Sequence, residues 1–256
     1  EPYRRQRQMC IRDRLYWLKL IIDMISITLS SEISEACPDL HVLAIACQVK
    51  NTEPDERLWE EITRVEEDIR STCKIEDINK WTPIFATRQA YKRLGKDPNR
   101  YRPSAEALRR RILRGLPLYK IDTLVDIVNL VSIRSGYSIG GFDADKIVGG
   151  LELGVGKEGE IYHGIGRGEL NIAGLPVYRD GVAGVGTPTS DEERTKIEMS
   201  TTSLLMILNG YSGKEGLLEA GGYSVDLLKR YVSAVNVEAE PVSYTHLRAH
   251  ETGAYL

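Results

Sequence analysis

The sequence has 256 residues, of which 42% are hydrophobic and 28% charged, so the chain can bury a core, which excludes a disordered or fibrous protein. The formal net charge is −3, from 34 Lys and Arg against 37 Asp and Glu, and this excludes a basic field over the whole molecule. The four cysteines, Cys10, Cys37, Cys47 and Cys73, have no CxxC spacing, which argues against a disulfide scaffold or a zinc site and indicates a reducing, cytosolic environment.

Both ends of the sequence resemble translated sequencing adapters of the transposase type. The run from Arg4 to Arg14 matches one adapter, and the run from Val242 to Thr252 matches the opposite one. We therefore interpret residues 1–14 and 242–256 as adapter-like segments. Met24 is then the first plausible start position in the segment between them. Removing residues 1–23 and 242–256 takes away seven basic and four acidic side chains, which leaves 27 against 33 and a net charge of −6.

Two short apolar segments come next along the chain. Residues 25–29 and 40–49 have the length and composition of strands, and Cys37-Pro38-Asp39 indicates a turn between them. The apolar stretch that leads into them, residues 15–29, contains Lys19 and Asp23 and is too short and too charged to cross a membrane. Residues 55–72 then place apolar side chains at helical spacing, with acidic side chains on the other faces, which predicts an amphipathic helix.

Three more helices are predicted before the middle of the chain. They cover residues 82–94, 104–113 and 121–131, and Gly136 is expected to terminate the last of them. Ser104 follows Pro103 directly and precedes a run of good helix formers, so we expect it to be an N-cap.

Beyond Gly140, glycine becomes frequent and the apolar segments become short. We expect a meander of strands at residues 147–155, 160–163, 170–178 and 201–208, followed by a helix near 225–235. Helices that precede strands favour an α+β fold over an alternating βαβ fold. The GxGxxG run from Gly154 to Gly159 is followed by a strand-like segment rather than a helix, so we interpret it as a hairpin turn and not as a dinucleotide site.

Basic residues are concentrated in one part of the chain. Between Arg88 and Lys120 there are eleven Lys or Arg residues and only two acidic ones, Asp97 and Glu106. Two interpretations remain open: a surface that contacts RNA phosphates, or a set of ion pairs with the acidic helix at residues 60–68. The candidate RNA-binding residues are Lys92, Arg93, Arg109, Arg110, Arg111, Arg114 and, in a later glycine-rich turn, Arg167.

A dense polar cluster lies at residues 186–195. It combines hydroxyls, carboxylates and Arg194 on a segment constrained by Pro188, and it is either a self-capped surface turn or part of a binding site. The sequence has no GxSxG elbow, P-loop or HExxH motif. A hydrolase built on this chain would therefore act through a positioned water or the substrate's own hydroxyl, not through a side-chain nucleophile.

The stretch IDTLVDIVNLVSIRSGYSIGGFDADKI at residues 121–147 resembles the B3/B4 domain of the phenylalanyl-tRNA synthetase beta subunit. The shared positions are Asp122, Val125, Asp126, Asn129, Gly136, Phe142, Asp143, Asp145 and Ile147. The segments LGKDPNRYRPSAEALRRRIL and TPTSDEERTKI extend the resemblance to stand-alone B3/B4 proteins, which have no aminoacylation core. The resemblance implies a single α+β domain over residues 24–241, helical to about residue 120, with the core motif at about 121–235.

The resemblance also implies a function. In synthetases this domain houses an editing site that hydrolyses misacylated tyrosine from tRNA without a covalent intermediate. The family's His before Ala-Phe-Asp aligns with Gly140, and its Arg two residues before Ile-Asp aligns with Tyr119. The family's tyrosine-reading Glu aligns with Ile207, or in a shifted register lies near Glu198.

These inferences together define the expected site and function. We expect a cytoplasmic protein that binds tRNA or aminoacyl-tRNA and hydrolyses the ester in trans, with no cofactor, no metal, no DNA and no membrane partner. The alternatives are a non-catalytic tRNA- or protein-binding module and a small-molecule hydrolase that reuses the pocket. The expected catalytic residues are Asp143, Thr189 and Asp191, and the expected substrate-binding residues are Tyr119, Asn129, Ser138, Gly140, Thr187, Arg194 and Thr195.

Overall fold

The computed structural model describes residues 25–242. The predictions for the adapter-like ends and for Met24 lie outside the described residues, except that Val242 forms the last residue of strand β10. Helices and strands are mixed along the chain, so the α+β class is confirmed.

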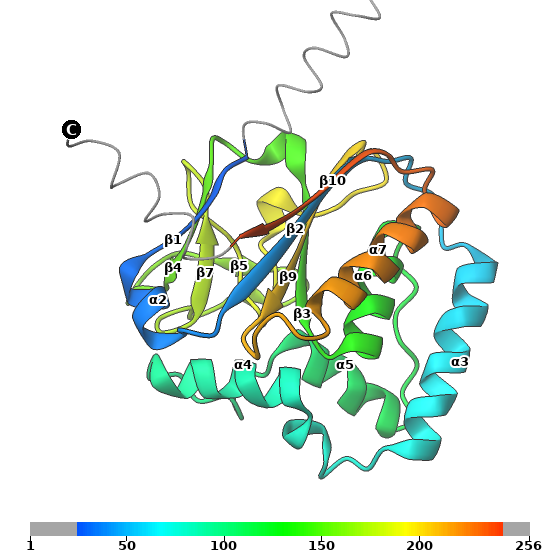
Figure 1. The fold of residues 1–256 in the computed structure, drawn as a ribbon, viewed down its shortest axis with the longest axis horizontal. Coiled ribbons are helices and arrows are strands. Elements are labelled where there is room, and N and C mark those ends of the chain that lie inside the picture. The colour runs from blue at the N-terminus through cyan, green and yellow to red at the C-terminus, as the bar shows by residue number, and fades with distance from the viewer. Residues whose placement is uncertain (1–24, 243–256) are drawn as a thin grey trace, which may run out of the picture.

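The main sheet has four strands, and all neighbouring strands are antiparallel (Figure 1). Their order is β10 (Val235–Val242), β2 (His41–Gln48), β9 (Ser203–Gly210) and β3 (Ser138–Asp143). The register between β2 and β9 is unbroken, from His41 opposite Gly210 to Gln48 opposite Ser203. A strand from the start of the chain thus lies between two strands from its end.

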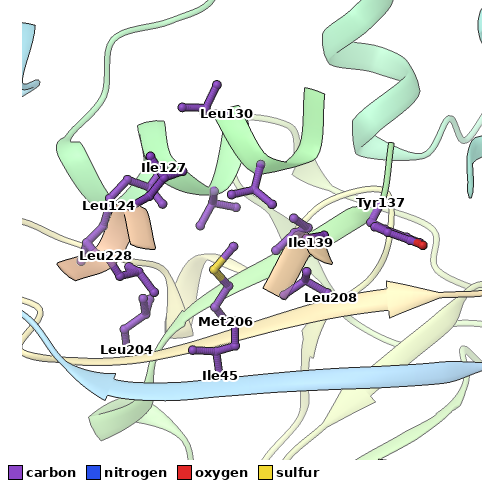
Figure 2. Close-up of a cluster of buried hydrophobic side chains, with 14 of the residues drawn as sticks. Ile45, Leu124, Ile127, Leu130, Tyr137, Ile139, Leu204, Met206, Leu208 and Leu228 are labelled. Carbon is purple, nitrogen blue, oxygen red and sulfur yellow. The ribbon is translucent and has the colours of Figure 1, made fainter. Parts of the chain in front are cut away.

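Both faces of this sheet are covered. In β9, Leu204, Met206 and Leu208 face a core shared with the helices, whereas Leu205 and Ile207 face a core shared with a second sheet. Strand β2 alternates in the same way, because successive side chains of a strand point to opposite faces. Figure 2 shows the helix-side core, where Ile45 and Met206 lie beneath side chains of the helices such as Ile127.

Four helices form the layer that covers the helix-side face of the main sheet (Figure 1). They are α3 (Glu56–Thr72), α5 (Ser104–Leu113), α6 (Thr123–Ser135) and α7 (Leu217–Tyr231). Asp55 caps α3 by accepting hydrogen bonds from the N–H groups of Arg57 and Leu58. Gly136 terminates α6 with a left-handed φ of 80°, and a Cβ there would lie 2.5 Å from the ring of Trp81. Only glycine satisfies both conditions.

The second sheet has the order β1 (Ile27–Leu29), β4 (Leu151–Val155), β7 (Pro176–Arg179) and β8 (Gly184–Gly186). The smaller elements are α2 (Ser31–Ala36), α4 (Thr82–Arg93), the 3-10 helices η1 (Ile78–Lys80), η2 (Ala144–Lys146) and η3 (Glu193–Thr195), and the hairpin β5 (His163–Gly164) to β6 (Gly168–Glu169). The GxGxxG run spans the end of β4 and the turn after it, with no helix following.

The structure corrects several predicted boundaries. Ser104 is the first residue of α5 and not its N-cap, since Pro103 holds that position and no side chain caps the helix. The predicted strands at 160–163 and 170–178 shorten to β5 and β7, because turns occupy most of those glycine-rich segments. Helix α7 begins at Leu217, eight residues before the predicted start. The prediction missed its first turns because they contain Gly221 and Gly222, and glycine has a low helix propensity. Strands β3 and β10 were not predicted.

Candidate functional site

An apolar pocket of about 420 Å³ opens between the helix layer, strand β3 and the segment 187–197. Its size is in the range of cavities that hold small organic ligands. Most of the lining surface is apolar, and seven of the fifteen lining residues are polar or charged. The pocket is lined by Ser104, Leu108, Ile121, Val125, Val128, Asn129, Ser132, Ile139, Gly141, Ile165, Thr187, Ser190, Asp191, Lys196 and Ile197.

One wall of the pocket comes from helix periodicity. Val125, Val128, Asn129 and Ser132 of α6 follow i, i+3, i+4 and i+7 spacing, which places them on one face of the helix. Ser132 is buried and donates a hydrogen bond from Oγ to the carbonyl of Tyr137 at 2.8 Å. The carboxamide of Asn129 has no hydrogen-bond partner among the described residues, so it is available to a ligand.

The opposite wall is a tight polar turn at residues 187–191. The Thr187 hydroxyl accepts hydrogen bonds from the N–H groups of Thr189 and Ser190 at 3.2 and 3.1 Å, and donates to the Ser190 carbonyl at 3.0 Å. This is the self-capped turn that Thr and Ser favour. The local geometry therefore follows from the sequence of the cluster itself.

Three other elements hold this turn in place. The Ser104 N–H at the start of α5 donates to the Pro188 carbonyl at 2.8 Å. The Tyr162 hydroxyl donates to the Ser190 carbonyl at 2.7 Å, and the Tyr91 hydroxyl lies 2.9 Å from the Thr189 hydroxyl oxygen. Burial raises the pKa of both tyrosines above the ordinary value, so both hydroxyls stay protonated. The turn is fixed before any ligand arrives.

Asp191 places a carboxylate at the edge of the pocket. Its Oδ2 accepts a hydrogen bond from the Gly141 N–H at 3.0 Å. Burial among apolar groups raises the pKa of Asp191 to about 7, although the Gly141 N–H acts in the opposite direction. A carboxylate with that pKa exchanges protons near neutral pH, as a general base must.

Glycines make room for this carboxylate. A Cβ at Gly186 would lie 3.0 Å from Oδ1 of Asp191 and 2.5 Å from the ring of Phe142. A Cβ at Gly140 would lie 2.6 Å from the same ring and 3.4 Å from the same oxygen. Gly140 therefore leaves space for Asp191 and Phe142 because it has no side chain, but it does not itself line the pocket.

The other two residues expected to be catalytic, Asp143 and Thr189, lie away from the lining of the pocket. Asp143 is buried, accepts hydrogen bonds from the Thr201 hydroxyl at 3.0 Å and the Asp145 N–H at 3.2 Å, and so fixes the start of η2. Thr189 is buried against Tyr91. Thr189 therefore helps to fix the turn, whereas Asp143 fixes η2.

Some of the expected substrate-binding residues line the pocket and others do not. Asn129 and Thr187 line the pocket. Arg194 instead forms a two-pronged ion pair with Asp180, at 2.8 and 3.0 Å, and this pairing holds the pKa of Asp180 below its usual value even though burial acts to raise it. Ser138 and Thr195 are buried, and their hydroxyls have no partner among the described residues.

A second hollow of about 330 Å³ lies beside the pocket and is strongly basic. We call it the arginine hollow. No acidic side chain lines it. Its lining consists of Arg100, Arg102, Ala107, Leu108, Arg110, Arg111, Arg114, Leu116, Tyr119 and Arg167.

Three of its guanidinium groups, those of Arg100, Arg114 and Arg167, have no ion-pair or hydrogen-bond partner among the described residues. Arg110 donates to the buried carboxylate of Glu106 at 2.8 Å. Arg111 donates to the Pro117 carbonyl at 2.6 Å. Unpaired guanidinium groups around a concavity favour an anionic ligand such as a phosphate.

The candidate RNA-binding residues separate accordingly. Arg110, Arg111, Arg114 and Arg167 line the arginine hollow. Arg109 is buried, donates to the Ile133 carbonyl at 2.8 Å and stacks on Trp81 at 3.5 Å, so it belongs to the core. Of the two residues on α4, Lys92 is exposed, and Arg93 donates to the Ala36 carbonyl at 2.8 Å; neither lines the hollow.

The alternative of ion pairs with the acidic helix has no support in the described residues. Of the α5 arginines, Arg110 pairs with Glu106 of its own helix, whereas Arg109 and Arg111 donate to backbone carbonyls. No ion pair among the described residues joins an α5 arginine to α3. Glu106 also accepts a hydrogen bond from Arg88 at 2.8 Å.

The pocket and the arginine hollow are neighbours. Leu108 of α5 lines both. The β5–β6 turn also reaches both, with Ile165 at the pocket and Arg167 at the hollow. The two cavities are therefore adjacent in the fold.

Sequence reasoning missed the apolar lining of the pocket, because its residues come from several separate segments of the chain. It also did not single out Arg100 and Arg102, although the excess of basic residues from 88 to 120 includes them. A larger cavity of about 460 Å³ lies at the far end of α6, beside Arg134 and Glu215, but a smaller share of its lining is apolar. Within residues 25–242, no group of three or more His, Cys, Asp or Glu is placed to hold a metal ion, and no helix has the length and hydropathy to cross a membrane.

Comparison with known protein families matches residues 86–217 to the B3/4 domain. Among solved structures, the chain is similar to an N-terminal fragment of the phenylalanyl-tRNA synthetase beta-subunit from Pyrococcus horikoshii, at 14% identity and a TM-score of 0.43. That similarity covers 91% of this chain and 61% of the fragment, so this chain spans less than two thirds of the fragment's length. No curated protein matches the sequence.

Proposed function

The chain belongs to the B3/4 domain family, and we propose that it binds an aminoacyl-tRNA, or a related aminoacylated RNA, and hydrolyses its ester. The aminoacyl group occupies the apolar pocket, and the RNA end occupies the arginine hollow. The observation that carries this proposal is that Leu108 lines both cavities, so they are adjacent.

The pocket suits the acyl part of such a substrate. Its walls are mainly aliphatic, from Val125, Val128, Ile139 and Ile197 among others, so burial of an apolar amino-acid side chain there gains hydrophobic free energy. Asn129 offers both a donor and an acceptor at the same site. This combination binds an acyl ester without a metal ligand or a covalent nucleophile.

The arginine hollow suits the other part of the substrate. Phosphates of an RNA strand carry one charge each, and the hollow is lined by Arg114 and Arg167, whose guanidinium groups have no partner within residues 25–242. The chain as a whole is acidic, so the attraction is local to this side of α5.

Asp191 supplies the chemistry in this proposal. Its carboxylate accepts a proton from a water molecule as the water oxygen attacks the ester carbonyl carbon. The bond between that carbon and the ribose oxygen then breaks, and the ribose oxygen takes up the proton that Asp191 accepted from the water. The Asn129 carboxamide stabilises the negative charge on the carbonyl oxygen. The Thr187 hydroxyl is engaged within the turn and the Thr189 hydroxyl with that of Tyr91, which agrees with a mechanism that uses neither as a nucleophile.

The test is a deacylation assay in which the full chain is mixed with a panel of tRNAs, each charged with a different amino acid. We expect turnover of at least one ester, and a fall of about 100-fold or more in Asp191→Asn, the usual contribution of a general base. Asp145→Asn is the matched control, because Asp145 is exposed on η2 and away from the pocket.

Two outcomes contradict the proposal. Hydrolysis that is equal in Asp191→Asn and in the control removes Asp191 from the mechanism. Binding of charged tRNA with no turnover of any ester shows a non-catalytic RNA-binding module instead.

A further inference from the structure

We propose that the arginine hollow recognises an unpaired RNA end by stacking one base on the ring of Tyr119. The inference rests on the proposed function, because it names the part of the RNA that the hollow holds. It adds a base-binding residue and a requirement for single-stranded RNA.

Tyr119 has the exposure that a stacking platform needs. It is 64% exposed, although it lines a hollow next to the buried residue Leu118. An aromatic ring left open to solvent in a concavity offers its face to a ligand, and every nucleobase has a π-face that can stack on it.

The ring is also held in position from behind. The Arg111 guanidinium carbon lies 4.0 Å from the centroid of the Tyr119 ring. Arg111 is itself fixed, because its Nε donates to the Pro117 carbonyl at 2.6 Å. The guanidinium plane thus occupies one face of the ring, and the other face remains for a base. A cation behind a ring that carries a base is a recurrent arrangement in single-strand binding.

Phosphate-binding groups flank this platform. Arg114 follows Arg111 by three residues, at the end of the same helix, and Arg167 reaches the hollow from the β5–β6 turn. Both are unpaired within the described residues. Leu116, which is 46% exposed, adds an apolar contact for the edge of the base or for the ribose.

The geometry favours a single strand over a duplex. Inside a duplex the faces of each base are covered by its neighbours, so an internal base can reach Tyr119 only if it is unstacked. The hollow is concave, and its lining includes Ala107 and Leu108 of α5. A nucleotide seated there lies directly beside the pocket, as the terminal nucleotide of an esterified RNA must.

The experiment measures binding of an uncharged, fluorescein-labelled single-stranded RNA octamer to the full chain by anisotropy. We expect Tyr119→Ala to weaken binding by about 5- to 150-fold, the range measured for loss of one stacked base. Tyr119→Phe retains the affinity, because it keeps the ring. Arg114→Ala lowers the slope of log affinity against log salt by about 0.7, whereas Tyr119→Ala leaves that slope unchanged.

Phe85→Ala is the matched control, because Phe85 is an exposed aromatic residue of α4, 50% exposed and outside the hollow. We expect it to leave the affinity unchanged. A blunt RNA duplex of the same sequence should bind wild type and Tyr119→Ala equally. The proposal is overturned if Tyr119→Ala binds the single strand as tightly as wild type, or if Tyr119→Phe weakens binding as much as Tyr119→Ala does. It is also overturned if Tyr119→Ala weakens duplex binding as much as single-strand binding.

This test is separate from that of the proposed function. The octamer carries no ester, so its binding depends on the hollow alone. Single-strand binding that depends on Tyr119, in a protein that hydrolyses no ester, supports the platform and refutes the hydrolase. Hydrolysis of charged tRNA that Tyr119→Ala leaves unchanged in both kcat and KM, together with unchanged octamer binding, refutes the platform and leaves the hydrolase.

Discussion

Replacement of Asp191 by Asn should change the pH dependence of folding stability. In the folded protein the pKa of Asp191 is about 7, because burial among apolar groups opposes its charge, whereas an unfolded chain releases the proton near 3.8. Between these values the folded state binds more protons than the unfolded state. The stability that Asp191 contributes is therefore complete below about pH 4 and is lost as the pH rises through 7.

The size of this effect follows from the two pKa values. A difference of one pKa unit corresponds to about 1.4 kcal/mol, so the change from 3.8 to about 7 gives about 4 kcal/mol as an upper figure. Water at the open side of the pocket reduces it, and we expect about 2 to 4 kcal/mol. Asn has nearly the same shape, keeps an oxygen that can accept the Gly141 N–H, and does not titrate.

The assay is urea unfolding of wild type and Asp191→Asn at five pH values from 4.5 to 8.5. We expect the variant to gain stability relative to wild type as the pH rises, with most of the change between pH 5 and 8. Asp145→Asn, at an exposed position, should show no comparable trend. A difference between wild type and Asp191→Asn that stays constant across the series would falsify the assignment of a raised pKa to this carboxyl.

Three further substitutions test the surroundings of the site, each by urea unfolding. Arg194→Ala should lower the free energy of unfolding by about 2 to 3 kcal/mol, because it leaves the buried carboxylate of Asp180 without its cation. A loss below about 0.5 kcal/mol would show that the pair contributes no more than an exposed surface pair. Glu106→Gln should cost about 3 kcal/mol, since Glu106 is fully buried between arginines, and a neutral result would contradict that role. Gly140→Ala should cost about 1 to 3 kcal/mol, as its Cβ would lie 2.6 Å from the Phe142 ring, and wild-type stability would show that the ring can move aside.

Much of the fold could be predicted from local patterns. Helix α3 was confirmed almost to the residue, because Asp55 caps it and its apolar side chains follow a helical period. Strand β2 was also confirmed, since a strand covered on both faces appears in the sequence as a continuous apolar run. Strand β3 was not predicted, because Gly140 and Gly141 at its centre have no side chains to form a pattern, yet all six of its residues are buried.

The site was only partly predictable. The turn chemistry of Thr187 and the residues after it was visible in the sequence, because those hydrogen bonds are local. Asp191 could not be distinguished from Asp143 without tertiary structure, since only packing shows that one borders a pocket and the other fixes η2. Arg109, Arg110 and Arg111 are consecutive on a helix, so they point in three directions, and the sequence does not tell which of them enters the core.

The doubly covered main sheet has a consequence for hydrogen exchange. Strands β2 and β9 have a hydrogen-bonded strand on each edge as well as a covered layer on each face. Their amides have no route to solvent through local opening, and they should exchange only when the whole molecule unfolds. The slowest-exchanging amides should therefore come from two segments about 160 residues apart in sequence and report one common free energy, that of global unfolding.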